Sequence, residues 1–159
     1  MATLEPRKNL AMLLRALELL DGELALALVG AQGWGDRLEL PGERVIRLGY
    51  VSRQDLARLY RGAEAFVYPS LFEGFGIPIL EAMASGAPCV VSAHPSMDEA
   101  CGRAAVRVEP TDPEAIAAGI AAALARREEL TKLGLVQAGG FSWRKAGEVM
   151  LSGYLEAAA

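Results

Sequence analysis

The segment Tyr68–Glu81 (YPSLFEGFGIPILE) concentrates the residues of this chain that could do chemistry. It follows a short apolar run, passes through a loop that holds Gly74 and Gly76, and enters a helix near Ile77. Glycines let a backbone approach a ligand closely, and the free amides and dipole at a helix start favour an anion or a hydroxyl-rich group. The pattern therefore predicts a loop and helix start that hold such a ligand.

Two carboxylates belong to this segment, Glu73 on the loop and Glu81 farther along the helix. Eight residues of continuous helix span about 12 Å. Glycosidases place their two carboxylates about 5–5.5 Å or 6.5–9.5 Å apart. Folding of the loop could shorten the separation, so a hydrolase is not excluded by spacing alone. The spacing suits two different parts of one elongated ligand better, and a nucleotide diphosphate sugar is such a ligand.

The elements around this segment alternate between short β-rich runs and helical patterns, which predicts a parallel sheet with helices on both faces. Caps are readable at Ser52, where Asp55 follows as in a capping box, at Asp112 before Pro113, and at Ser142. Ligands bind at the carboxyl ends of the strands in such sheets, where the glycine loop would lie. The expected strands are 24–30, 44–48, 65–68, 88–92 and 104–108.

The N-terminus departs from this plan. Thr3-Leu4-Glu5-Pro6 reads as the end of a strand that turns into a helix, with only two residues before it. A doubly wound sheet normally begins with a full strand, so we expect the chain to start late, inside or just after a truncated first strand. The open edge predicts a weakened fold or self-association of the chain through that edge.

Composition and charge narrow the classes of protein to which the chain could belong. The 159 residues are enough for one domain, with 52% hydrophobic and 23% charged residues. The net charge of −4 argues against a nucleic-acid partner. Two cysteines are too few for a disulfide framework, which favours a cytoplasmic setting. Since no apolar run approaches the roughly 20 residues that cross a bilayer, we expect no membrane contact from this domain. Peripheral attachment of a parent enzyme stays open.

The extended motif resembles a known family. EGFGIPILE, with YPS upstream and EAMASGAPCVVS downstream, is similar to the signature of retaining glycosyltransferases of the GT-B, glycogen-synthase-like type, also called group 1 glycosyltransferases. TLEPRKNL, LALALVG, RLGYVSRQDLARLYRGAEAFVYPS, VEPTDPEAIAAGI and the closing FSW follow in the family's order, so the resemblance covers nearly the whole chain.

This resemblance implies that residues 1–159 form a nucleotide-sugar-binding C-terminal domain, one half of a GT-B architecture with a Rossmann-like α/β fold. The acceptor-binding N-terminal domain would be absent. The parent enzyme would transfer a hexose from a nucleotide diphosphate sugar with retention at the anomeric carbon. The family's usual account has the departing phosphate take the acceptor's proton on the same face. We therefore expect the isolated chain to bind donor at best and to be inactive in transfer.

The resemblance also implies residue roles. Glu73 would be the catalytic-site glutamate that faces the hydroxyls of the transferred sugar, and Glu81 would accept hydrogen bonds from the ribose. No metal or other cofactor is implied, and the sequence shows no acidic metal cluster. The other donor-binding residues would be the backbone of Gly74, Phe75, Gly76 and Ile77, the cationic pair Arg7 and Lys8 near the diphosphate, and Tyr50, Val51 and Leu80 near the base.

Simpler interpretations accompany these roles. Glu73 could be a solvated loop carboxylate, Glu81 an ordinary helix glutamate, and Lys8 a surface charge. The chain also departs from the family, because many relatives carry arginine at the position of Thr3 and proline at that of Asp98. Among residues outside the motif, we interpret the lone His94 as structural or incidental and Cys89 as core. We interpret Trp143 as a packing anchor for the closing helix, which in the family crosses toward the other domain.

Two other classes of function remain. One is a stand-alone nucleotide-sugar-binding module, or a subunit that pairs with an acceptor domain on another chain. The other is a nucleotide-sugar epimerase or hydrolase on the same two-domain plan. Such enzymes need acid/base groups of their own, and this segment supplies only its two glutamates.

Overall fold

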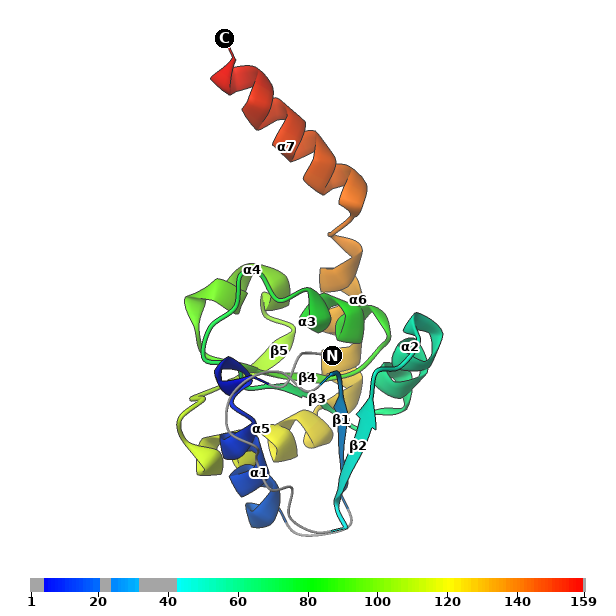
Figure 1. The fold of residues 1–159 in the computed structure, drawn as a ribbon, viewed down its shortest axis with the longest axis vertical. Coiled ribbons are helices and arrows are strands. Elements are labelled where there is room, and N and C mark those ends of the chain that lie inside the picture. The colour runs from blue at the N-terminus through cyan, green and yellow to red at the C-terminus, as the bar shows by residue number, and fades with distance from the viewer. Residues whose placement is uncertain (1–4, 21–23, 32–42, 159) are drawn as a thin grey trace.

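A computed structural model describes residues 5–20, 24–31 and 43–158 of the chain. Helices and parallel strands alternate along it (Figure 1). The elements, in chain order, are η1 (Pro6–Lys8), α1 (Leu10–Leu19), β1 (Leu26–Val29), β2 (Val45–Gly49), α2 (Arg53–Gly62), β3 (Phe66–Tyr68), α3 (Ile77–Ala84), β4 (Cys89–Ser92), η2 (Pro95–Met97), α4 (Asp98–Cys101), β5 (Ala105–Val108), α5 (Pro113–Ala125), α6 (Arg127–Gly139) and α7 (Trp143–Ala157).

Every strand in the described residues pairs in parallel, which confirms the expected α/β class. β1 pairs with β2, and β3, β4 and β5 form a second group in that order. The five strands lie within one or two residues of the predicted ranges. β4 is buried at all four positions, as a strand covered on both faces must be.

The core has two parts, one on each face of the strands. One part joins α2, α3 and α4 through residues such as Leu56, Ile79 and Ala100. The other joins α1 and α5 through residues such as Leu13 and Ile116. Because Cys89 and Val91 belong to the first part and Val90 to the second, β4 separates them by simple alternation. Cys89 is fully buried, as predicted.

The predicted caps are confirmed. The side chains of Ser52, Asp112 and Ser142 each accept a hydrogen bond from the backbone N–H three residues on, at the starts of α2, α5 and α7. At α2 the second bond of the cap differs from the expected box, because the Ser52 hydroxyl donates to the Asp55 carboxylate at 2.7 Å. Each cap fixes where the chain leaves a loop and enters a helix.

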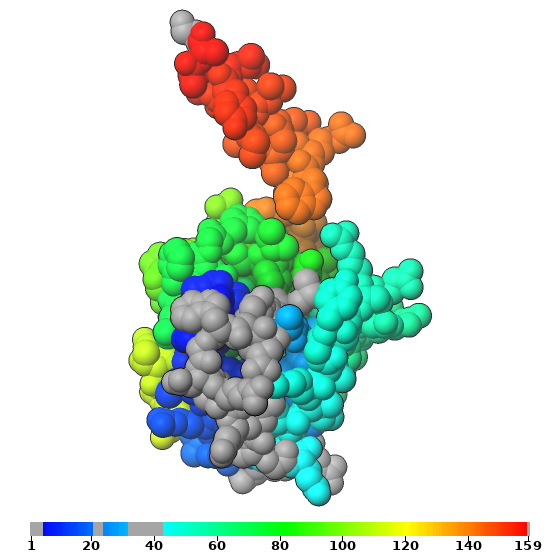
Figure 2. Space-filling view, in the orientation of Figure 1, coloured from blue at the N-terminus to red at the C-terminus, as the bar shows by residue number. Residues whose placement is uncertain are grey.

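The closing helix corrects one prediction. Trp143 was expected to anchor α7 by packing, but its side chain is 83% exposed and no residue of α7 is buried. Figures 1 and 2 show why: α7 points away from the rest of the described chain, and none of the described helices or strands lies beside it along its length. Its apolar side chains have no tertiary partner among the described residues.

The expected truncated first strand falls at the edge of what the structure describes. Thr3 and Leu4 lie outside the described residues, and the described chain begins at Glu5. Among the described residues, no backbone hydrogen bond joins β1 to β3. The sheet is therefore in two sections, with an apolar cavity between them.

Candidate functional site

The carboxyl end of β3 brings Glu73 to two cations from the start of the chain. The Lys8 ammonium donates to Glu73 Oε1 at 2.7 Å, and the Arg7 guanidinium contacts Glu73 Oε2 at 2.7 Å. Lys8 also donates to the Tyr68 hydroxyl at 2.9 Å and lies 5.0 Å from the centre of that ring. These groups form one charged cluster, which we call the Glu73 cluster: Arg7, Lys8, Tyr68 and Glu73.

Glu73 is buried, with 7% of its surface exposed, so it is not a solvated loop carboxylate. Burial acts to raise the pKa of Glu73, but hydrogen bonds, led by that from Lys8, outweigh it and hold the pKa below its usual range. The hydrogen bond to Glu73 in turn raises the pKa of Arg7. Burial first, and then the charge of Glu73, raises the pKa of Tyr68. The cluster therefore holds Glu73 ionised.

The backbone around η1 fixes this arrangement. The Leu71 amide donates to the Arg7 carbonyl at 2.9 Å, and Arg7 Nη1 donates to the Phe72 carbonyl at 2.8 Å. Asn9, in the left-handed region at φ 57°, donates through its side-chain amide to the carbonyls of Pro69 and Pro110. Asparagine tolerates this conformation better than most residues. No local sequence pattern predicts these long-range bonds, and Asn9 was not predicted as a site residue.

Ser96 and His94 support the loop from the other side. The Glu73 amide donates to Ser96 Oγ at 3.2 Å, and Ser96 Oγ lies 2.8 Å from His94 Nδ1. The Ser96 amide donates to the same His94 nitrogen at 3.1 Å, so His94 caps η2. The structural interpretation of His94 is therefore confirmed. The contribution of Ser96 to the loop was missed, because a lone serine carries no sequence signal for it.

α3 begins where the glycine loop ends, as predicted. Gly76 precedes it at φ 98°, and Pro78 occupies its first turn. Gly74 and Ile77 are exposed, and Phe75 is half-buried with its ring 5.8 Å from that of Phe141. The start of α3 thus follows the Glu73 cluster directly and presents exposed residues beside it.

The remaining predicted site residues lie around α2 and α3. Glu81 is exposed on α3, and its charge, after burial, contributes to raising the pKa of Tyr60. Leu80 and Val51 are half-buried and pack against the core part that contains Leu56 and Ile79. Tyr50 is 83% exposed. The structure therefore brings Arg7, Lys8 and Glu73 into direct contact, whereas Glu81, Tyr50, Val51 and Leu80 are not members of that cluster.

Within the described residues, no three histidine, cysteine, aspartate or glutamate side chains gather as a metal site. In the same part of the chain, no helix is both long and apolar enough to cross a bilayer.

Comparison with known proteins gives the class. The solved sucrose-phosphate synthase of Thermosynechococcus elongatus superposes with a TM-score of 0.80 at 26% identity, covering 100% of this chain and 45% of that one. Anabaena Alr3699/HepE, solved in complex with UDP and glucose, superposes with a TM-score of 0.80 at 21% identity, covering 96% of this chain and 47% of that one. The fold is that of one half of a GT-B glycosyltransferase.

The family follows from the sequence comparisons. The family described as "Glycosyl transferases group 1" matches residues 1–135. O-antigen chain mannosyltransferase B of Escherichia coli is 43% identical over 166 residues, which cover 96% of this chain and 44% of that protein. Serotype-specific mannosyltransferase WbdA of Escherichia coli is 33% identical over 171 residues, which cover 97% of this chain and 21% of that protein. The chain belongs to the group 1 glycosyltransferase family, and it spans less than half the length of these relatives.

Proposed function

We propose that this chain is the donor-binding C-terminal domain of a retaining hexosyltransferase, and that its donor is a nucleotide diphosphate sugar. The observation that carries the proposal is the buried Glu73 held between Arg7 and Lys8 beside the start of α3. Two cations and a helix start form a binding place for a diphosphate, and a carboxylate beside them accepts hydroxyl hydrogen bonds. The relatives named as mannosyltransferases make a mannosyl donor the first choice.

The Glu73 cluster sets how the donor would bind. Without a ligand, the charges of Arg7 and Lys8 are balanced by Glu73 and, for Arg7, also by Glu5. A diphosphate would compete with Glu73 for the two cations, because charge-assisted bonds to phosphate are among the stronger hydrogen bonds. Glu73, relieved of part of its pairing, would then accept hydrogen bonds from the sugar. Glu81, exposed farther along α3, would accept hydrogen bonds from the ribose.

In the transfer itself, the bond between the anomeric carbon and the departing phosphate breaks, and the acceptor oxygen bonds on the same face. The acceptor's proton passes to the leaving phosphate oxygen. Arg7, Lys8 and the α3 amides would stabilise the charge that grows on the departing diphosphate, which is electrostatic catalysis by groups already in place. On the family's two-domain plan the acceptor binds to the other half of the enzyme, so we expect negligible transfer by residues 1–159 alone.

Calorimetric titration tests the proposal. The chain is titrated with GDP-mannose, UDP-glucose and ADP-glucose, then repeated with Glu73→Ala, Glu81→Ala and the exposed α7 control Glu148→Ala. We expect Glu81→Ala to weaken the binding of every nucleotide sugar about 10- to 100-fold, because the substitution removes hydrogen bonds that the charged carboxylate accepts. Glu73→Ala should mainly erase discrimination between sugars, and Glu148→Ala should change nothing. Absence of binding by the folded chain to all three donors would contradict the proposal.

A further inference from the structure

The backbone of Glu73 is held by hydrogen bonds that begin at His94. The Glu73 amide donates to Ser96 Oγ at 3.2 Å, Ser96 Oγ lies 2.8 Å from His94 Nδ1, and the Ser96 amide donates to the same nitrogen at 3.1 Å. We call this set of groups the His94 relay: the His94 ring, Ser96 and the Glu73 amide. The relay joins the start of η2 to the loop that carries Glu73.

The directions of these bonds require a neutral His94. A backbone amide can only donate, so the Ser96 amide needs a lone pair on Nδ1. The Glu73 amide likewise donates to Ser96 Oγ, which leaves the hydroxyl proton of Ser96 free to be donated to Nδ1. With Nδ1 as an acceptor, the ring proton of a neutral imidazole lies on Nε2. The His94 relay is therefore complete in one protonation state and one tautomer of His94.

Protonation of His94 would disturb the relay at the Ser96 amide. An imidazolium carries a proton on both ring nitrogens, so Nδ1 would face the Ser96 amide as donor against donor. The Ser96 hydroxyl can turn and accept the new proton, but the amide cannot reverse its role. The His94 ring also meets the Phe72 ring edge-on, with ring centres 5.9 Å apart. Movement of Ser96 away from the ring would therefore be felt by the loop at both Phe72 and Glu73.

The backbone of His94 is held in place by β5. Arg107 Nη2 donates to the His94 carbonyl at 3.0 Å, and Arg107 pairs with Asp98 of α4 at 2.7 Å. In the described part of the chain, the charged groups around the relay are thus Arg107 on β5, Asp98 on α4 and Glu73 on the glycine loop. The His94 side chain is half-buried, so solvent protons can reach it. A change of charge on the ring is then passed to Ser96 and the loop.

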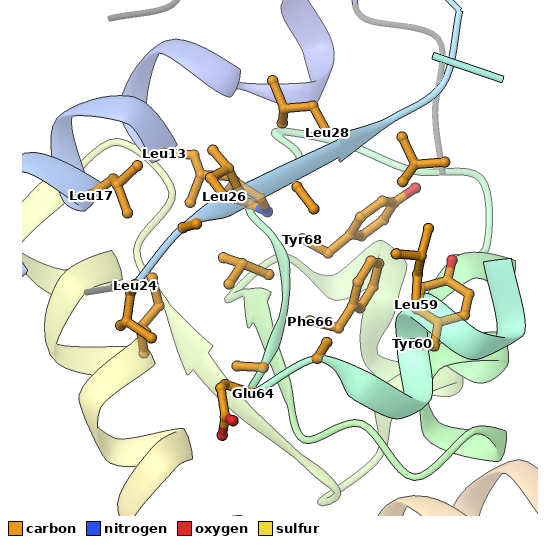
Figure 3. A pocket seen from close by; sticks show the side chains of 18 of the residues that line it. Leu13, Leu17, Leu24, Leu26, Leu28, Leu59, Tyr60, Glu64, Phe66 and Tyr68 are labelled. Carbon is orange, nitrogen blue, oxygen red and sulfur yellow. The ribbon is translucent and has the colours of Figure 1, made fainter. Parts of the chain in front are cut away.

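Near neutral pH, His94 is the side chain of the relay whose charge changes. It is the one histidine of the chain, and histidine titrates between about pH 5 and pH 8. Burial acts to raise the pKa of Glu73, but hydrogen bonds hold it below its usual range. Burial raises the pKa of Tyr68, whose ring lies in the wall of the apolar cavity shown in Figure 3. Burial also raises the pKa of Cys89 to about 12, and that of Cys101 as well.

We infer that His94 and Ser96 are positioning residues for Glu73: neutral His94 holds the Glu73 loop in its donor-binding place, and protonation of His94 loosens the loop and weakens donor binding. Both phosphates of a nucleotide diphosphate sugar are esterified, so the ligand itself does not titrate near neutral pH. The effect on donor affinity deepens the proposed function and rests on it, whereas the relay in the free chain does not.

The relay is tested first without ligand, by nuclear magnetic resonance between about pH 7.5 and pH 5.5. We expect the Glu73 amide shift to follow the His94 ring with the same midpoint, and the neutral ring to carry its proton on Nε2. His94→Asn keeps an acceptor oxygen but does not titrate, so its Glu73 amide should stay at the high-pH position. In Ser96→Ala the ring should titrate while the Glu73 amide no longer follows. The Glu148 amide of α7 is the control and should not move.

Calorimetric titration with GDP-mannose then measures donor affinity over the same range of pH. We expect the Kd of the unchanged chain to rise about three- to tenfold from about pH 7.5 to pH 5.5, which corresponds to the loss of about one hydrogen bond. His94→Asn should bind like the unchanged chain at the higher pH and keep that affinity at the lower one. Ser96→Ala should bind more weakly at both pH values, with no dependence on pH, because its relay is cut.

The outcomes separate this inference from the proposed function. A Glu73 amide that ignores the titration of His94 in the free chain would overturn the relay, whatever the donor does. An amide that follows His94 while the Kd stays constant would overturn the positioning role and leave the proposed function intact. Absence of donor binding at every pH would remove the proposed function and the claim on affinity together. If His94→Asn does not fold, the comparison of the unchanged chain with Ser96→Ala decides alone.

Discussion

At the scale of single residues, the ionisation of Glu73 makes the stability of the folded chain depend on pH. The pKa of Glu73 lies below its usual value, so the folded chain binds fewer protons there than the unfolded chain does. Its contribution to stability is therefore complete above the unfolded pKa, about 4.3, and is lost as pH falls through the lower folded pKa. Exposed carboxylates such as Glu129 have lowered pKa values as well, so they share in the loss at acid pH.

Glu73→Gln isolates that contribution. We expect its free energy of unfolding to fall less steeply than that of the unchanged chain between about pH 5 and pH 3, because glutamine does not titrate. Urea unfolding at half-unit pH steps measures this. Glu148→Gln on exposed α7 serves as control and should keep the original slope. Parallel slopes for Glu73→Gln and the unchanged chain would contradict the role of this carboxyl.

Lys8→Met tests the Glu73 cluster by removing one of its two cations. Lys8 and Glu73 are 14% and 9% exposed in their side chains, whereas the Arg126–Glu129 pair is 48% and 55% exposed. Removing one partner of a mostly buried pair leaves the other poorly compensated, so we expect a loss of about 1–3 kcal/mol. Arg126→Met should cost less than Lys8→Met, because solvent screens an exposed ion pair. Equal losses in urea unfolding would show that burial of the Glu73 cluster is unimportant.

At the scale of elements, the entry into α3 depends on one backbone conformation. Gly76 has φ 98°, and a Cβ there would lie 2.8 Å from Ile79 Cδ1. Gly74 has open space around the same position. We expect Gly76→Ala to lower the free energy of unfolding by about 1–2 kcal/mol, because a left-handed conformation strains a residue with a Cβ. Gly74→Ala should change it by less than about 0.5 kcal/mol in the same urea experiment.

Some of the helices and strands were predictable from the sequence and others were not. The strands were predicted because they are short apolar runs, and the caps because their bonds are local. α6 was not predicted as a separate helix. It packs on α3 through Gly134, where a Cβ would lie 3.2 Å from Met83 Cγ, and glycine gives no helical signal. Trp143 was placed wrongly because a tryptophan predicts packing but not the presence of a partner.

The candidate site, too, was predicted only in part. The motif around Glu73 was picked out from its residue pattern, and the pair Arg7 and Lys8 from the resemblance to the family. Their contact was not, because 65 residues separate Glu73 from Lys8 and no local pattern encodes such a pairing. Ser96 and Asn9 hold the loop through bonds that only the folded chain reveals. Whether these groups bind donor stays a prediction for the titrations above.

At the scale of the whole molecule, α7 stands clear of the body (Figure 2). We expect a chain that ends at Ser142 to keep its free energy of unfolding within about 0.5 kcal/mol, because no residue of α7 is buried. Leu14→Ala, in the core, should cost about 2–5 kcal/mol and shows that the assay responds. A loss on truncation comparable to that of Leu14→Ala would mean that α7 packs on the body in solution.

Lys8 contacts both Glu73 and Tyr68, so a ligand that draws its ammonium aside changes the surroundings of both groups. In the proposed complex a phosphate and Glu73 compete for this ammonium, and the proton bound at Glu73 is therefore linked to the donor bound at Lys8. Thermodynamic reciprocity requires protonation of Glu73 to change donor affinity by the same factor by which the donor changes the proton affinity of Glu73. Titrations with the same nucleotide sugar at two pH values would measure that coupling.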